Sequence, residues 1–194
     1  DSFTRRSKKE GYRSRASYKL KELLETDIKL SKGDSVLDLG SFPGGWSQVA
    51  SEIVGKSGKV AAIDIQRMKP IEGCFFLKRS IEEVAEKDFE EIRDFLPFDL
   101  VLSDMAPNIS GIRERDDALM MELVDKTLLI VDKLLKTKGS TLIKVFQGES
   151  LDYTREALSI RFNKVKISKP KASRSNSKEI YIIGKELKNY ERTS

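Results

Sequence analysis

The fold is decided by residues 35–64, which begin with the run SVLDL (35–39), continue into GSFPGG (40–45) and end with KVAAID (59–64). The two apolar runs predict buried strands, and the segment 46–54 between them predicts a helix. Glycines directly after a strand let the backbone turn sharply and approach a ligand closely. Such a βαβ unit predicts a parallel sheet with a ligand site at the carboxyl ends of its strands.

Strand and helix patterns also alternate on both sides of this unit. Further helices are predicted over 15–28, 81–94 and 116–136, and further strands over 74–77, 99–103, 140–146, 163–168 and 179–184. Only about ten polar residues join the last two strands, too few for a crossover helix, so an antiparallel edge hairpin is expected. The prediction is therefore an α/β, Rossmann-like fold with a mostly parallel seven-stranded sheet.

Composition limits the chemistry that the chain can perform. Its 194 residues include no histidine and a single cysteine, which excludes a Ser-His-Asp triad, an imidazole base, a thiolate zinc cluster and an internal disulfide. We therefore expect no metal, and acid–base chemistry by carboxylates, lysine or tyrosine. The length fits one domain, 1–194, and no apolar run is long enough to span a membrane. A monomeric, cytoplasmic protein is expected.

Positive charge is concentrated in two segments. The net charge is only +5, yet residues 1–21 hold eight basic and two acidic residues, and 161–178 hold seven basic and no acidic residues. This distribution predicts a surface that binds a polyanion, above all nucleic acid, although a solvated tail and hairpin are the alternative. The residues assigned to nucleic-acid contact are Arg5, Arg6, Lys8, Lys9, Arg13, Arg15, Arg174 and Lys178.

A nucleotide-type cofactor is indicated by the residue that ends the second strand of the unit. Asp64 follows Gly44 by twenty residues, a spacing at which a carboxylate binds a ribose diol in α/β folds. The glycines do not have the G-x-G-x-x-G spacing of dinucleotide sites, and no Gly-Lys-Ser/Thr phosphate loop is present. S-adenosylmethionine, an adenosine without phosphate, fits best. The alternatives are a loop that only turns a corner and an aspartate that caps a helix.

Three charged residues border or interrupt predicted strands. Asp104 follows the strand 99–103, Lys144 lies inside 140–146, and Glu179 begins 179–184. A lysine in a central apolar strand is costly unless it is paired. Lys144 is therefore either a catalytic group or a surface group on an edge strand.

Five motifs carry a resemblance to a known family. They are RSRASYKL (13–20), DLGSFPGGWSQ (38–48), SDMAPN (103–108), KVFQG (144–148) and SRSNSKEIY (173–181). In this order they resemble the FtsJ (RrmJ or RlmE) ribosomal RNA ribose 2′-O-methyltransferases, over residues 12–184. The resemblance implies a class I S-adenosylmethionine-dependent methyltransferase fold, with S-adenosylhomocysteine as the product of the cofactor.

The family's residues can be transferred position by position. Its catalytic tetrad falls on Lys19, Asp104, Lys144 and Glu179. Its cofactor contacts fall on Gly40, Pro43, Gly44, Gly45, Trp46, Asp64, Ser80 and Asp104. Ser80 is a departure, since bacterial members carry an aspartate that faces the adenine there. In this hypothesis Lys144 takes the proton of the ribose hydroxyl or stabilises the hydroxyl as it loses that proton, Asp104 holds Lys144, and Glu179 and Lys19 orient ribose and phosphate.

The resemblance also implies a substrate, a uridine of large-subunit ribosomal RNA presented by the assembled subunit. Met105 and Gln147 match the ribosomal branch, whereas the branch that methylates the tRNA anticodon loop tends to differ there. Three alternatives remain open: a tRNA methyltransferase, a non-catalytic RNA-binding assembly factor on the same fold, and a nicotinamide oxidoreductase.

Overall fold

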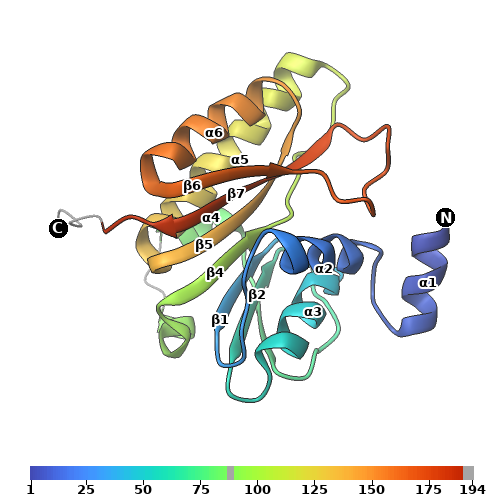
Figure 1. Ribbon diagram of the computed structural model, residues 1–194, viewed down its shortest axis with the longest axis vertical. Helices are drawn as coiled ribbons and strands as arrows, with labels where there is room; N and C mark the ends of the chain where they lie inside the picture. Colours follow the sequence, from blue (N-terminus) through green and yellow to red (C-terminus); the bar gives the residue numbers. More distant parts are fainter. Residues whose placement is uncertain (87–89, 190–194) are drawn as a thin grey trace.

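A seven-stranded sheet with helices on both faces forms the centre of the computed structural model, which describes residues 1–86 and 90–189 (Figure 1). The strands are β1 (Ser35–Leu39), β2 (Lys59–Asp64), β3 (Cys74–Lys78), β4 (Phe98–Ser103), β5 (Leu135–Phe146), β6 (Phe162–Ser168) and β7 (Glu179–Leu187). The helices are α1 (Ser2–Glu10), α2 (Ala16–Thr26), α3 (Gly45–Val54), α4 (Ile81–Glu86), the 3-10 helix η1 (Glu90–Phe95), α5 (Arg113–Leu134) and α6 (Glu149–Arg161).

The strand order is β3-β2-β1-β4-β5-β7-β6. The first five strands in this order pair in parallel, and β7 pairs antiparallel with both β5 and β6. The predicted parallel sheet and its antiparallel edge hairpin are therefore confirmed. The strand that carries Lys144, β5, lies between β4 and β7, and β6 forms the edge of the sheet. Lys144 is therefore not on an edge strand.

Alternation along the strands divides the core into two clusters, one on each face of the sheet. Leu142 of β5 packs with residues of α2 and α3, whereas Ile143 and Val145 pack with residues of α5 and α6. Successive side chains of a strand point to opposite faces. Lys144 therefore points to the face that α2 and α3 cover.

Two helices were not predicted from the sequence, and one prediction was too long. α1 is rich in charge and buries only Ser7, and the buried residues of α6 are Ser150, Thr154 and Leu158, so neither helix has a wide apolar stripe. The segment predicted as one helix, 81–94, contains α4 and the separate helix η1, and residues 87–89 lie outside the described residues. In the described part of the chain, no helix has the length and apolar character needed to cross a membrane.

Candidate active site

Lys144 lies in the sheet with two carboxylates beside it. Its residue surface is only 9% exposed. Its Nζ lies 3.4 Å from Asp104 Oδ1 and 3.6 Å from Glu179 Oε1, and it donates to the Asp104 backbone carbonyl at 3.2 Å. A buried ammonium is tolerated when opposite charges and acceptors surround it. The structure thus pairs this lysine rather than exposing it at an edge.

The topology brings these groups together from distant parts of the chain. Asp104 directly follows β4, and the register of β5 with β7 sets Lys144 opposite Tyr181 and Phe146 opposite Glu179. Residues two apart on a strand share a face, so Lys144, Tyr181 and Glu179 point to the same side. From α2, the Nζ of Lys19 reaches within 3.9 Å of Glu179 Oε2. Glu179 therefore lies between two ammonium groups.

Tyr181 is part of this cluster, although it was not among the predicted site residues. Its hydroxyl donates to Asp104 Oδ1 at 2.9 Å, and its side chain is fully buried. Burial, and next the negative charge of Asp104, raise the pKa of Tyr181 well above its usual value. The tyrosine stays protonated and fixes the carboxylate that faces Lys144. Tyr181 ends the motif 173–181, but its place beside Lys144 follows only from the β5–β7 register.

The glycine-rich turn between β1 and α3 lies next to this cluster. Gly40 has φ +71°, and a Cβ there would lie 2.3 Å from Met105 Cγ, so the chain after Asp104 passes close over the turn. Gly44 has φ +117° and is the residue from which α3 starts. A narrow pocket opens beside the turn, lined by Ser14, Ala16, Asp38, Gly40, Ser41, Phe42, Pro43, Gly45, Trp46 and Asp104.

Asp64 anchors this turn to the end of β2. One carboxylate oxygen accepts from the Phe42 backbone N–H at 2.9 Å, and the other accepts from the Gln66 N–H at 2.8 Å. No helix follows Asp64 within the described residues 65–80, so the idea that it caps a helix is wrong. Each carboxylate oxygen can accept a further bond, as a ribose diol requires.

Asp38 is a buried acid in β1 that was not among the predicted site residues. Its Oδ2 accepts from Ser47 Oγ at 2.7 Å, while the buried Oδ1 has no hydrogen-bond partner among the described residues. Burial is the main cause that raises the pKa of Asp38 to about 7. The signal was present, because an acid inside the run 35–39 is as unusual as the lysine inside β5.

Two of the predicted cofactor residues have clear structural tasks. The Trp46 Nε1 donates to the Ala16 carbonyl at 2.8 Å, and its ring packs 5.7 Å from the ring of Tyr181. Ser80 Oγ accepts from the Glu83 N–H, while Glu83 Oε2 accepts from the Ser80 N–H, which forms a capping box at the start of α4. The Ser80 hydroxyl can still donate its own hydrogen.

Arg13, predicted to contact nucleic acid, is used inside the protein. Its guanidinium donates to the carbonyls of Pro43, Lys69 and Pro70, and its backbone N–H donates to Gln48 Oε1. These contacts hold the N-terminal segment against the glycine-rich turn. Arg13 therefore stabilises the pocket wall, and the structure gives no separate support to the predicted RNA contact.

The other predicted basic residues fall into two groups. Arg15 binds Asp1 and the Ala172 carbonyl, and Arg6 pairs with Glu10 while lying over the ring of Tyr18. The remaining side chains are exposed: Arg5, Lys8, Lys9, Arg174 and Lys178. Helix α1 and the loop between β6 and β7 project from the same side of the molecule, at the right of Figure 1. The exposed cations thus flank the cluster around Lys144.

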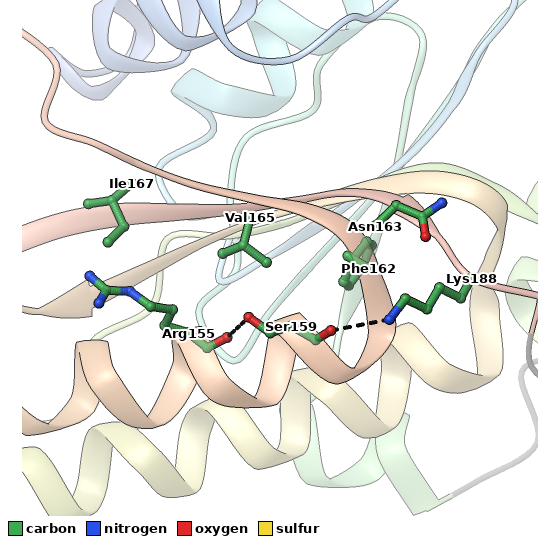
Figure 2. A pocket seen from close by; sticks show the side chains of 7 residues that line it. All are labelled: Arg155, Ser159, Phe162, Asn163, Val165, Ile167 and Lys188. Atoms are coloured by element: carbon green, nitrogen blue, oxygen red, sulfur yellow. Dashed lines mark hydrogen bonds between the residues drawn. The ribbon is translucent and has the colours of Figure 1, made fainter.

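A wider hollow lies elsewhere, between α6 and β6 (Figure 2). This groove of about 410 Å³ is lined by Arg155, Ser159, Phe162, Asn163, Val165, Ile167 and Lys188. None of these described lining residues is acidic, and none forms a hydrogen bond or an ion pair with Lys144, Asp104, Glu179 or Lys19. Size alone would select the groove, but the convergent charges select the pocket beside the glycine-rich turn.

This fold and this site define a class of protein, the class I methyltransferases. Fibrillarin of Aeropyrum pernix, solved with S-adenosylmethionine bound, shares the fold at a TM-score of 0.55 and 15% identity, over 87% of this chain and 73% of that one. A protein of Plasmodium falciparum assigned as a ribosomal RNA methyltransferase superposes with a TM-score of 0.80 at 30% identity, over 91% of this chain and 98% of that one.

The family follows from the sequence comparison. The profile of the FtsJ-like methyltransferases matches residues 12–187, and the chain belongs to this family. Among its curated relatives, ribosomal RNA large subunit methyltransferase E of Xanthomonas campestris pv. campestris is 48% identical over 186 residues, which is 95% of this chain and 88% of that protein. The family resemblance inferred from the motifs is confirmed.

Proposed function

We propose that the protein transfers the methyl group of S-adenosylmethionine to the ribose 2′-hydroxyl of a uridine in large-subunit ribosomal RNA, within the assembled subunit. The observation that carries this proposal is the buried Lys144, paired with Asp104 and Glu179 beside the glycine-rich turn. The relatives' assignment as large-subunit methyltransferases supports the substrate. The proposed enzyme is monomeric and cytoplasmic.

The residues around the turn fit the cofactor. The second lone pairs of Asp64 suit a ribose diol, and the unpartnered Oδ1 of Asp38 suits an ammonium group. Gly40 and Gly44 leave no Cβ in the way, Gly45, Pro43 and Trp46 line the pocket, and Ser80 would donate to the adenine. When bound, S-adenosylmethionine supplies an electrophilic methyl group on its sulfonium.

The tetrad would act on the ribose hydroxyl. Lys144 would either take the proton of the 2′-hydroxyl as a neutral amine or, as an ammonium, stabilise the negative charge that develops on the oxygen while the proton passes to water. No histidine is available for either role. Asp104, held by the Tyr181 hydroxyl, fixes the Lys144 ammonium on the sheet. Glu179 holds Lys144 on one side and Lys19 on the other, which leaves Lys19 able to orient the ribose or its phosphate.

The exposed cations would bind the RNA backbone. Arg5, Lys8, Lys9, Arg174 and Lys178 lie on segments that flank the site, and phosphate contacts of this kind weaken as salt rises. Arg6, Arg13 and Arg15 would contribute mainly by holding the N-terminal segment in place.

The test is methyl transfer from labelled S-adenosylmethionine to three substrates, all from cells that lack the modification: intact large subunits, protein-free large-subunit RNA, and total tRNA. We expect label in the subunits, recovered after nuclease digestion as 2′-O-methyluridine. Label in tRNA alone would replace the proposal by tRNA methylation. Binding of the subunits without transfer would favour a non-catalytic assembly factor.

A further inference from the structure

The loop between β4 and α5 exposes two large apolar side chains next to the candidate active site. Ile109 is 61% exposed and Ile112 is 58% exposed, and every residue from 108 to 115 is exposed. Single exposed apolar residues are common and need no explanation. Here, however, two isoleucines share one short loop that starts at Asp104, whose carbonyl and carboxylate contact Lys144.

The loop is held in this arrangement by a buried carboxylate. Asp116 Oδ1 accepts from both the N–H and the Oγ of Ser110 at 2.8 Å, and its Oδ2 accepts from the Gly111 N–H at 3.1 Å. These bonds, with the backbone bond from Ser110 foremost, lower the pKa of Asp116. Asp116 stays ionised and fixes the backbone between the two isoleucines, so their exposure is built into the loop.

Positive charges surround this loop on the side of the site. The Arg113 guanidinium lies over Gly148, since its Nη2 is 2.8 Å from where a Cβ on that glycine would be. Lys178, which precedes Glu179, is close enough for its charge to lower the pKa of Asp116 further. Arg115 is also exposed. Arg113, 3.9 Å from Asp117, and Arg115 begin α5 with the exposed Glu114 between them. The loop thus places apolar groups next to cations, at the ends of the strands that carry Lys144 and Glu179.

We propose that Ile109 and Ile112 form the contact surface for unpaired RNA bases next to the target nucleotide, while Arg113, Arg115 and Lys178 contact the adjoining phosphates. This inference rests on the proposed function, because a ribose at Lys144 carries its chain neighbours past this loop. Unpaired nucleotides combine apolar base faces with phosphate charges, which is the combination that the loop presents. The choice of RNA rests on the position of the loop, which begins at the residue that contacts Lys144.

The test compares the double variant Ile109→Ser/Ile112→Ser with wild type in steady-state methylation of unmodified large subunits. We expect the KM for subunits to rise about tenfold, or about 1.4 kcal/mol, with kcat within about twofold. The affinity for S-adenosylmethionine, measured by calorimetry, and the thermal midpoint should not change. A matched control is Leu129→Ser/Ile160→Ser, at two isoleucine-sized side chains that are 50% and 57% exposed on α5 and α6. The control should keep the wild-type KM.

The outcomes separate this inference from the proposed function. If wild type does not methylate the subunits, the proposed function fails and the inference falls with it. If wild type is active and the loop variant keeps its KM, or loses only kcat, the assignment of the loop to base contact is overturned while the proposed function stands. An equal rise of KM in the control variant would also overturn it, since any exposed apolar residue would then do the same.

Discussion

The groove and the pocket described above differ in what their side chains do. The groove between α6 and β6 has room, but its Lys188 Nζ is within 3.4–3.5 Å of helix carbonyls at Ser159 and Ile160 (Figure 2). The pocket beside the glycine-rich turn is narrow, yet charges from three strands and a helix converge next to it. Chemistry is thus indicated by the pairing of buried charges rather than by volume.

The pocket and the groove should differ most in the rate of methyl transfer after one cation is removed from each. We expect Lys144→Ala to lower the rate of methyl transfer about 100- to 10,000-fold. The ribose hydroxyl then lacks the group that takes its proton or stabilises the negative charge on its oxygen. Arg155→Ala, in the groove, should keep the wild-type rate. The measurement is single-turnover transfer to large subunits at saturating cofactor. A Lys144→Ala enzyme with near wild-type turnover would show that the base lies elsewhere.

Asp38 allows the pocket to be tested through stability. Its pKa in the folded protein is about 7, against an ordinary value of 3.8, so the fold favours the neutral acid. The stability that comes with a neutral Asp38 is fully present below pH 3.8 and is lost as the pH rises toward about 7. Burial of the charge then costs about 4 kcal/mol, and Asp38→Asn should remove most of it.

Urea unfolding of both proteins at about pH 5 and about pH 8 measures this difference. Wild type should lose more stability than Asp38→Asn between the two values. Parallel losses in the two proteins would contradict the proposed burial of a titrating acid at this wall.

Two glycines sharpen the comparison further. Alanine at Gly44 meets a φ of +117° and places its Cβ 2.8 Å from Ile71 and 3.1 Å from Arg13, so it should weaken S-adenosylmethionine binding about tenfold. Alanine at Gly184 places its Cβ 2.6 Å from the ring of Phe162, which lines the groove, and should cost about 1–3 kcal/mol of stability. Calorimetric titration should show unchanged cofactor affinity for Gly184→Ala. Equal S-adenosylmethionine affinities of wild type, Gly44→Ala and Gly184→Ala would contradict the prediction that the glycine-rich turn binds the cofactor.

The smallest effect should come from Lys188. Its ammonium interacts with the last carbonyls of α6, a favourable position for a cation at a helix C-terminus. Lys188→Ala should lower the free energy of unfolding by about 0.3–1 kcal/mol and leave methylation unchanged. A clear loss of methylation would give the groove a part in the reaction and would remove the contrast between the two regions.

The sequence predicted the sheet and three members of the tetrad because these leave local signals. Apolar runs, or alternation of apolar and polar residues as in 163–168, mark the seven strands, and Asp104, Lys144 and Glu179 stand out as charges in or directly after strands. The structure adds that the four side chains lie next to one another. Their catalytic roles stay a prediction. Lys19, on a helix with many other charges, could be selected only through the resemblance to the family.

Other features left no such signal. The buried face of α6 uses hydroxyls that bond to carbonyls one turn earlier, as Thr154 does to Ser150 and Ser150 to Phe146. Such a face is polar in sequence although it is buried in the fold. Tyr181 depends on a strand register, and the partners of Arg13 are backbone carbonyls 30 to 57 positions away. No pattern of side chains predicts a bond to a distant carbonyl.

The contacts of Arg13 have a mechanical consequence. A single guanidinium joins the wall at Pro43 to the loop at Lys69 and Pro70, and the chain that bears it enters α2 and reaches Lys19 within two turns. The wall of the pocket and the helix that bears the outermost ammonium of the tetrad are therefore tied together through one side chain. This tie favours a common alignment of the turn and of the helix whose Lys19 faces Glu179.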